Sequence, residues 1–127
     1  MSKKIIFDAN AILRYILYDI PEQADMAEKT LQNNKVIILP EIIMEVVFVM
    51  FKFYKIPREE ISEGVIKFLN DAKCENINLI NAIKTFGNTN FDFVDCLLYE
   101  YSKQKDCEIF TFDENLIKLI IQNNKEE

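Results

Sequence analysis

The sequence has no histidine, and this absence excludes several kinds of catalytic site. Serine–histidine triads, cysteine–histidine pairs, histidine-ligated zinc and imidazole acid–base catalysis all need that side chain. The two glycines, Gly64 and Gly87, are too few for a P-loop or a glycine-rich dinucleotide turn. Acidic side chains are plentiful by comparison, with 21 Asp and Glu against 15 Lys and Arg.

Cysteines and long apolar runs are also scarce. The chain has three cysteines, Cys74, Cys96 and Cys107. They lack CxxC spacing, which is typical of reduced thiols in a cytosolic protein. The apolar run before Asp8 is too short for a signal peptide. The most apolar stretch, residues 42–54, is interrupted by Glu45 and Lys52 and falls short of a membrane span. We therefore expect a cytoplasmic protein with no membrane association.

The length and composition fit a single domain over residues 1–127, since 50% of the residues are hydrophobic and 28% are charged. Short apolar runs predict strands at residues 4–7, 36–39 and 108–112, with 76–80 as a weaker candidate. Helical patterns lie between them, at residues 21–34, 41–55, 58–71, 92–105 and 114–123. This alternation predicts a three-layer α/β domain, in which helices flank a central, mostly parallel sheet of about 4–5 strands.

Acidic residues follow two of the predicted strands. Asp8 comes directly after residues 4–7, and Asp113 comes directly after residues 108–112. Sites in open α/β sheets form at the carboxyl ends of the strands. If both strands are parallel, the two carboxylates emerge at the same edge of the sheet.

Two further acids lie in apolar helical segments. Glu45 belongs to a helix that is apolar on nearly every face, so we expect its side chain to be buried and to need a partner or a cation. The alternative is a glutamate that reaches solvent at an edge or pairs with a lysine. Asp92 fits an N-cap, which leaves Asp95 as the functional acid and Asp92 as accessory.

Folding can bring Asp8, Glu45, Asp95 and Asp113 into one pocket. Two carboxylates about 4 Å apart repel by about 4 kcal/mol at an effective dielectric constant of 20. Such a cluster persists where protons or a divalent cation relieve the repulsion. Oxygen-only ligands with open positions suit Mg²⁺ or Mn²⁺.

Four segments of the chain resemble, in order and spacing, the acidic motifs of PIN-domain nucleases, and in particular those of the VapC toxins: IIFDANAILRYIL, PEIIMEVVFVM, NFDFVDCLL and TFDENL. The resemblance implies that the catalytic and metal-binding residues are Asp8, Glu45, Asp95 and Asp113. Asn10 and Thr111 match accessory polar positions of the family. Ala9 departs from the family pattern, because the family often has Thr or Ser there.

The resemblance also implies an activity and partners. The expected activity is cleavage of RNA phosphodiester bonds by a metal-activated water, as in a Mg²⁺- or Mn²⁺-dependent endoribonuclease. The expected partners are a VapB-like antitoxin and a second copy of the chain. Independently of the resemblance, the apolar helical segment that carries Phe48, Phe51, Phe53 and Tyr54 favours packing or a dimer interface over base stacking.

The net charge of −6 argues against a nucleic-acid partner, although bound cations would offset part of it. Basic residues near the motifs are candidates to line an RNA path: Arg14, Lys52, Lys55 and Arg58. The alternative is that they belong to ordinary solvated faces.

Two other functions stay open. One is a PIN fold that has lost catalysis and serves as a binding partner. The other is a receiver-like signalling domain, which also has an acidic Mg²⁺ pocket at its strand ends. The receiver interpretation is weaker, because Pro40 follows the central apolar run and Asp113, rather than a lysine, follows the last one.

Overall fold

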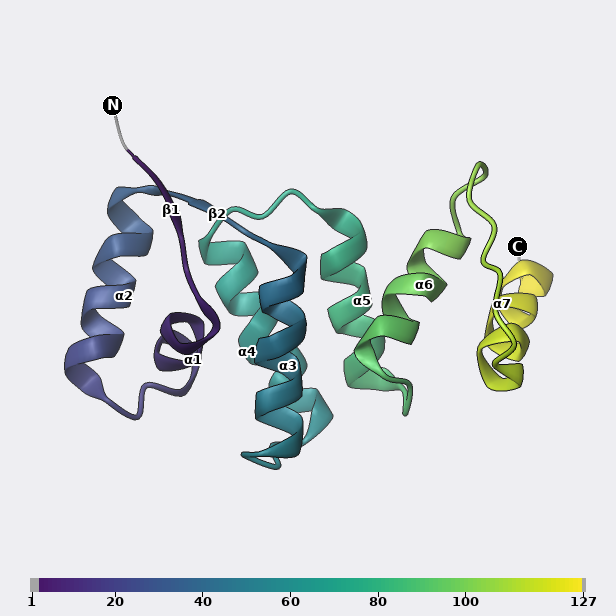
Figure 1. The fold of residues 1–127 in the computed structure, drawn as a ribbon, viewed down its shortest axis with the longest axis horizontal. Coiled ribbons are helices and arrows are strands. Elements are labelled where there is room, and N and C mark those ends of the chain that lie inside the picture. Colours follow the sequence, from purple (N-terminus) through teal and green to yellow (C-terminus); the bar gives the residue numbers. More distant parts are fainter. Residues whose placement is uncertain (1–2, 127) are drawn as a thin grey trace.

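The computed structural model describes residues 3–126. Its elements, in chain order, are β1 (Lys4–Ile6), α1 (Ala9–Leu17), α2 (Pro21–Asn33), β2 (Lys35–Ile37), α3 (Pro40–Lys52), α4 (Arg58–Asp71), α5 (Ile77–Asn88), α6 (Phe93–Ser102) and α7 (Glu114–Glu126). Figure 1 shows β1, α1 and α2 at one end of the molecule and α7 at the other, with α3, α4 and α5 between them.

The sheet is small. β1 and β2 pair in parallel, with Ile5 opposite Val36, and α1 and α2 form the crossover between them. The expected α/β character and parallel pairing are therefore present. Within residues 3–126 the sheet has two strands, so the predicted central sheet of 4–5 strands is not formed.

Residues 77–80 form the first turn of α5, with Asn76 as its N-cap, and the prediction of a strand over residues 76–80 was wrong. The side chain of Asn76 caps α5 by accepting a hydrogen bond from the Leu79 amide at 3.1 Å. Leu79 and Ile83 then lie one helical turn apart on the buried face. A short apolar run fits a buried helix face as well as a strand, and the cap decides between them.

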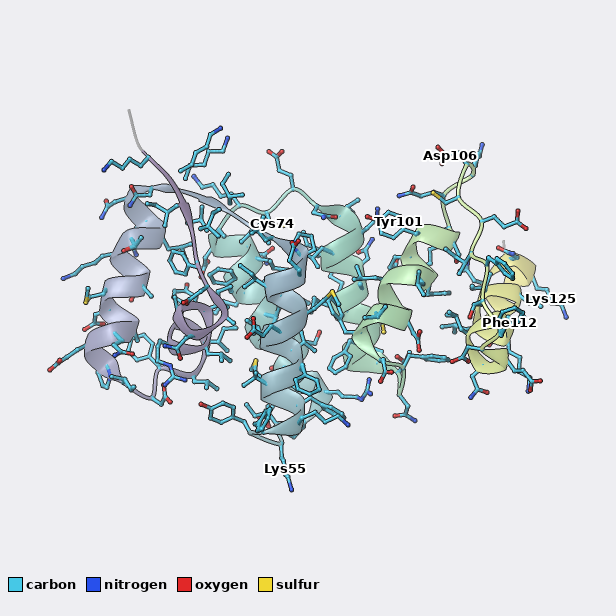
Figure 2. The ribbon with its side chains drawn as sticks, in the orientation of Figure 1. Lys55, Cys74, Tyr101, Asp106, Phe112 and Lys125 are labelled. Carbon is cyan, nitrogen blue, oxygen red and sulfur yellow. The ribbon has the colours of Figure 1, made fainter. Side chains whose placement is uncertain are left out.

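Residues 108–112 are not part of the sheet, although we predicted a strand there. In the described part of the chain, no backbone hydrogen bond joins this segment to β1 or β2. Phe110 and Phe112 are 88% and 86% exposed. Figure 2 shows Phe112 beside α7, at the end of the molecule far from β1. The edge of β1 that faces away from β2 consequently has no neighbouring strand among the described residues.

The sequence patterns located five helices and missed two. Residues 58–71 coincide with α4, and α2, α3, α6 and α7 begin or end within a few residues of their predicted bounds. The patterns missed α1 and α5. α1 starts directly after β1, because Asp8 caps it, with Oδ1 accepting a hydrogen bond from the Ala11 amide at 2.8 Å.

The two glycines lie where helices pack closely. A Cβ atom on Gly64 of α4 would lie 2.8 Å from Cγ2 of Ile16 on α1. A Cβ atom on Gly87 of α5 would lie 2.7 Å from Cβ of Ser62 on α4. Glycine at these positions lets α4 approach α1 and α5.

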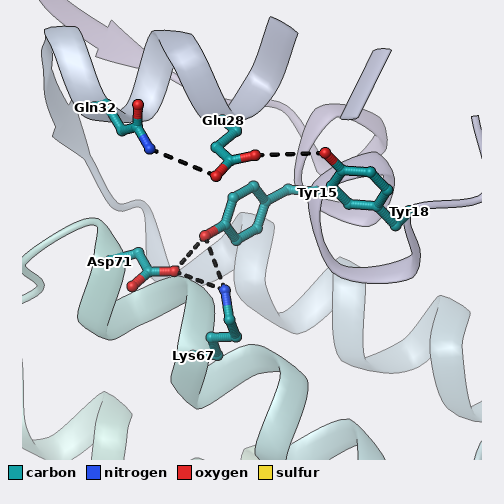
Figure 3. Close-up of polar contacts among 6 residues, drawn as sticks. All are labelled: Tyr15, Tyr18, Glu28, Gln32, Lys67 and Asp71. Atoms are coloured by element: carbon teal, nitrogen blue, oxygen red, sulfur yellow. Dashed lines mark hydrogen bonds and ion pairs between the residues drawn. The ribbon is translucent and has the colours of Figure 1, made fainter. Parts of the chain in front are cut away.

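Polar contacts join α1 to its neighbours (Figure 3). The Tyr15 hydroxyl donates to Asp71, and Lys67 binds both, at 3.2 Å from the hydroxyl and 3.0 Å from Asp71 Oδ2. The hydrogen bond from Tyr15 is the main reason that the pKa of Asp71 is lowered. The Tyr18 hydroxyl donates to Asp25 and, at 3.4 Å, to Glu28 on α2.

No helix within residues 3–126 is both long enough and apolar enough to cross a membrane. The cysteines Cys74, Cys96 and Cys107 are free thiols.

Candidate acidic active site

Three aspartates line one open cleft between the start of α6 and α7. They are Asp92, Asp95 and Asp113, and we call this the acidic cleft. Its volume is about 430 Å³, and its other lining residues are Asn90, Phe91, Asn115, Lys118, Leu119 and Gln122. Two of the four predicted catalytic acids, Asp95 and Asp113, therefore lie together with the predicted accessory residue Asp92.

Asp113 reaches the acidic cleft as the cap of α7. Its Oδ1 accepts hydrogen bonds from the amides of Asn115 at 2.9 Å and Leu116 at 3.0 Å. Its own amide donates to the Thr111 hydroxyl at 3.0 Å, so Thr111 shapes the turn that presents the carboxylate. These bonds engage one carboxylate oxygen and leave Oδ2 for a ligand.

Asp92 and Asp95 stand at the start of α6. Asp92 has the backbone position of the N-cap but makes no capping hydrogen bond with its side chain. Its carboxylate is exposed and lines the cleft, so the predicted N-cap position is confirmed but the side-chain capping bond expected there is not formed. Asp95 is half-buried in the first turn of the helix.

Burial and neighbouring negative charge decide the electrostatics of Asp95 in the acidic cleft. Burial, followed by the negative charges of Asp113 and Asp92, raises the pKa of Asp95 above its ordinary value. A position in the first turn of a helix normally favours a negative charge. The net shift is upward, so burial and repulsion outweigh the helix dipole, and a cation in the cleft would relieve both.

Asp8 does not lie in the acidic cleft. It lines a separate cleft of about 480 Å³ beside β1, α1 and α2, together with Asn10 and Arg14. One of its oxygens caps α1, as described above. Asp8 and Asp113 therefore lie in different clefts. The prediction placed both at one edge of the sheet, but residues 108–112 do not pair with β1 or β2.

Glu45 is exposed, and the prediction that it is buried was wrong. α3 has a solvent-facing stripe at helical spacing that consists of Glu41, Glu45, Phe48 and Lys52. The apolar Phe48 on this stripe made the helix resemble a fully buried one in sequence.

Glu45 borders a second cleft of about 620 Å³, which we call the aromatic cleft because Phe48, Phe51, Phe86 and Phe93 line it. Asp92 lines both this cleft and the acidic cleft. The two clefts therefore adjoin at Asp92. Asp95 lines the acidic cleft, and Glu45 lines the aromatic cleft beside it.

The donor types suit a hard divalent cation, because the acidic cleft offers only oxygen ligands from its acids and amides. The spacing is wider than a closed site requires. Among residues 3–126, no three Asp, Glu, Cys or His side chains are close enough to hold one ion together.

The four basic residues that we considered for an RNA path differ in their surroundings. Arg14 is mostly buried, pairs with Asp19 at 3.1 Å and donates to the Tyr54 hydroxyl at 3.2 Å. Lys52 and Lys55 are exposed. Arg58 donates to backbone carbonyls and is half-buried, so its guanidinium is engaged inside the protein.

Sequence reasoning missed the basic residue of the acidic cleft itself. Lys118 lines the cleft, and Asn115, Leu119 and Gln122 accompany it on α7. Counted from Asn115, these four residues have the i, i+3, i+4 and i+7 spacing of one helix face, and their helix begins directly after Asp113. That spacing, in the helix that Asp113 caps, is the signal that would have identified them.

Cys96 is adjacent to Asp95 but takes no part in the cleft. It is fully buried, and burial raises the pKa of its thiol to about 11. The thiol stays protonated near neutral pH, which excludes Cys96 as a nucleophile.

Comparison with known proteins identifies a family for the chain. The family model described as PIN domain matches residues 5–120. No curated protein and no solved structure matches the chain. PIN domains are commonly nucleases, and they typically use divalent metals. Because the match covers nearly the whole length, the chain belongs to the PIN-domain family.

Proposed function

We propose that this protein is a divalent-metal-dependent endoribonuclease whose reaction takes place in the acidic cleft. The observation that carries the proposal is the grouping of Asp92, Asp95 and Asp113 in one cleft, where the burial of Asp95 and the negative charges of the other two raise its pKa. Membership of the PIN-domain family supports the same chemistry.

In this proposal Asp95 and Asp113 hold a Mg²⁺ or Mn²⁺ ion, with Asp92 accessory. A bound ion would neutralise charge on the phosphate and lower the pKa of its water. Glu45 would add a further carboxylate to the metal site from the adjoining aromatic cleft. Lys118 offers a positive charge inside the acidic cleft for a phosphate group, and Lys52 and Lys55 extend the path along exposed surface.

Asp8, with Asn10 beside it, requires a change of structure to join the other acids. We propose that residues 108–112 add to the open edge of β1 as a parallel strand, within the larger sheet that the sequence predicts. Three features support this. The backbone of the segment has no hydrogen-bonded strand partner among the described residues, and its Phe110 and Phe112 are exposed. Asp113 directly follows this apolar segment, as Asp8 directly follows residues 4–7.

The proposal includes partners. By resemblance to VapC toxins, the protein acts as the toxin of a toxin–antitoxin pair, is restrained by a VapB-like antitoxin and forms a homodimer in the cytoplasm. The exposed aromatic side chains of Phe48 and Phe53 support an apolar contact surface on or next to α3.

The test is cleavage of a structured RNA in the presence of Mg²⁺ or Mn²⁺. Wild type should cleave, whereas Asp95→Asn and Asp113→Asn should each reduce the rate by at least about 100-fold, as loss of groups that stabilise transition-state charge does. Asp106→Asn is the matched control, because Asp106 is an exposed aspartate on the loop between α6 and α7 (Figure 2). Equal cleavage by wild type and Asp95→Asn would refute the proposal.

The second candidate is a PIN fold without catalysis. The wide spacing of the acids among residues 3–126 favours it. A wild-type protein that binds RNA or a partner but yields no metal-dependent products would support this alternative. Membership of the PIN-domain family argues against the receiver-like interpretation.

A further inference from the structure

Arg58, at the start of α4, collects backbone carbonyl oxygens from one short stretch of chain. Nη1 donates to the carbonyls of Phe86 at 3.3 Å, Thr89 at 3.0 Å and Phe91 at 2.7 Å. Nη2 donates to the carbonyl of Asn90 at 3.2 Å. One guanidinium therefore binds both the last turn of α5 and the turn that leads into α6.

The same guanidinium contacts two aromatic rings. Its Cζ lies 4.9 Å from the centroid of Phe51 and 4.3 Å from that of Phe86. Cation–π contact with both rings restrains the position of the guanidinium beside its carbonyl partners.

The turn that Arg58 binds is also a wall of the acidic cleft. Asn90, Phe91 and Asp92 line the cleft in succession. Arg58 does not line it, but its guanidinium donates to the carbonyls of Asn90 and Phe91. Asp92 then begins α6, where its carbonyl accepts a hydrogen bond from the Cys96 amide at 3.0 Å. Asp95 lies within that first turn, so its position depends on where the turn is held.

We propose that Arg58 is a positioning residue of the active site, which fixes Asp92 and Asp95 by holding residues 89–91 against α4 and the end of α5. This inference rests on the proposed function for its catalytic meaning, and on the hydrogen bonds of Arg58 for its mechanism. It replaces the role of Arg58 as an RNA-contacting residue.

The role requires the shape of arginine as well as its charge. The hydrogen bonds use both terminal nitrogens of a planar fork, and a lysine ammonium is a single point on a flexible stem. Lysine at this position keeps the positive charge near the acids and loses the simultaneous contacts. The pair Arg58→Lys and Arg58→Gln therefore separates geometry from charge.

The matched control is Lys52→Gln. Lys52 also places a cation over Phe51, with Nζ 5.2 Å from the ring centroid, but it donates no hydrogen bond to residues 86–91. A further variant, Phe51→Leu, keeps the arginine and removes one of the two aromatic rings that it contacts. This variant tests the positioning role if substitution of Arg58 prevents folding.

Two readouts test the proposal, both at temperatures below the unfolding transition of each variant. The first is the affinity for Mn²⁺ alone, measured by calorimetry. Arg58→Lys and Arg58→Gln should each weaken it at least about tenfold, as loss of residues that orient metal ligands does. The second is amide hydrogen exchange, which should accelerate in residues 86–97 and stay unchanged in α2, at the other end of the molecule (Figure 1).

The outcomes are distinct. Wild-type Mn²⁺ affinity in Arg58→Lys would show that charge alone suffices and would overturn the proposal. Unchanged amide hydrogen exchange in residues 86–97 of the Arg58 variants would also overturn the proposal. Equal acceleration of exchange in α2 would overturn it as well, because it would indicate general destabilisation. If the wild type itself takes up no Mn²⁺, the proposed function fails, and hydrogen exchange alone decides whether Arg58 holds the turn.

Discussion

Asp8 and Asp113 each use one carboxylate oxygen to cap a helix, and each leaves the other oxygen for a ligand. The cap is what fixes the direction of the side chain. At the scale of single residues, the proposed site therefore depends on ordinary local rules: an acid after an extended segment starts a helix and is held in place by the amides of that helix.

Asp95 provides a test of whether the acidic cleft is strained without a cation. Its folded-state pKa is raised, so the folded protein holds the proton more tightly than the unfolded chain, and ionisation lowers stability as pH rises through that pKa. In chelator-treated protein at pH 7, Asp95→Asn should raise the melting temperature by about 1–3 °C.

The gain should disappear at about pH 3 and below, where the carboxyl is largely protonated in both states. Calorimetric melting curves at the two pH values check this, with Asp106→Asn as the control that should show no gain. A lower melting temperature for Asp95→Asn at pH 7 would mean that the carboxylate stabilises the fold.

The two glycines should differ in their tolerance of alanine. At Gly87 the added methyl group meets Cβ of Ser62, which cannot move without its backbone, whereas at Gly64 it meets a terminal methyl of Ile16. Gly87→Ala should lower the free energy of unfolding by about 1–3 kcal/mol, and Gly64→Ala by less. Urea denaturation measures both, and an equal or reversed order would contradict the packing described.

Residue identities predicted part of the site. Asp92, Asp95 and Asp113 do share a cleft, whereas Asp8 and Glu45 lie outside it. The exposure of Glu45 could not be predicted from the sequence, because an apolar helix that exposes one aromatic side chain has nearly the same sequence pattern as a fully buried helix. Arg58 shows the converse limit: its partners are backbone carbonyls, which leave no mark in the sequence.

At the scale of elements, helices were easier to predict than strands. The helix over residues 58–71 has both a periodic apolar face and clear boundaries, and it appears as predicted. Strands depend on partners far away in the chain, so an apolar run alone does not specify pairing. Residues 108–112 have strand composition, yet they find no partner within the described structure.

The proposed addition of residues 108–112 to β1 can be tested by a disulfide. If Asp113 pairs with Asp8, Phe110 lies opposite Ile5, because each is three residues earlier. In a variant with Cys74, Cys96 and Cys107 replaced by serine, Ile5→Cys with Phe110→Cys should form an intrachain disulfide under mild oxidation when Mn²⁺ and RNA are present.

Non-reducing mass spectrometry of peptides identifies the bond. Ile5→Cys with Tyr101→Cys is the control pair, since Tyr101 is exposed but lies on α6, outside the proposed strand. Absence of the intrachain bond would contradict the proposed strand addition, and a bond only between chains would assign the strand to a second copy.

At the scale of the whole molecule, the exposed aromatics of α3 and the residue after it raise the question of assembly. Phe48 and Phe53 are 55% and 72% exposed, and their rings lie 6.1 Å apart. If they form the proposed dimer contact, Phe48→Asp with Phe53→Asp should shift the protein from dimer to monomer in sedimentation analysis. Because both side chains lie outside the core, the helical circular dichroism should stay unchanged. A wild-type monomer would contradict the dimer.

The acidic cleft accounts for part of the negative charge of the whole molecule. Part of the net charge of −6 comes from three aspartates that line one cleft, and this is where a divalent ion gains most. Such an ion would draw the acids together and stabilise the folded state in proportion to its concentration.

The most direct measurement is calorimetric titration of the metal-free protein with Mn²⁺. We expect saturable uptake by wild type and by Asp106→Asn, and loss of that uptake in Asp95→Asn and Asp113→Asn. Uptake that survives in both cleft variants, or no uptake by wild type, would contradict a metal site in the acidic cleft.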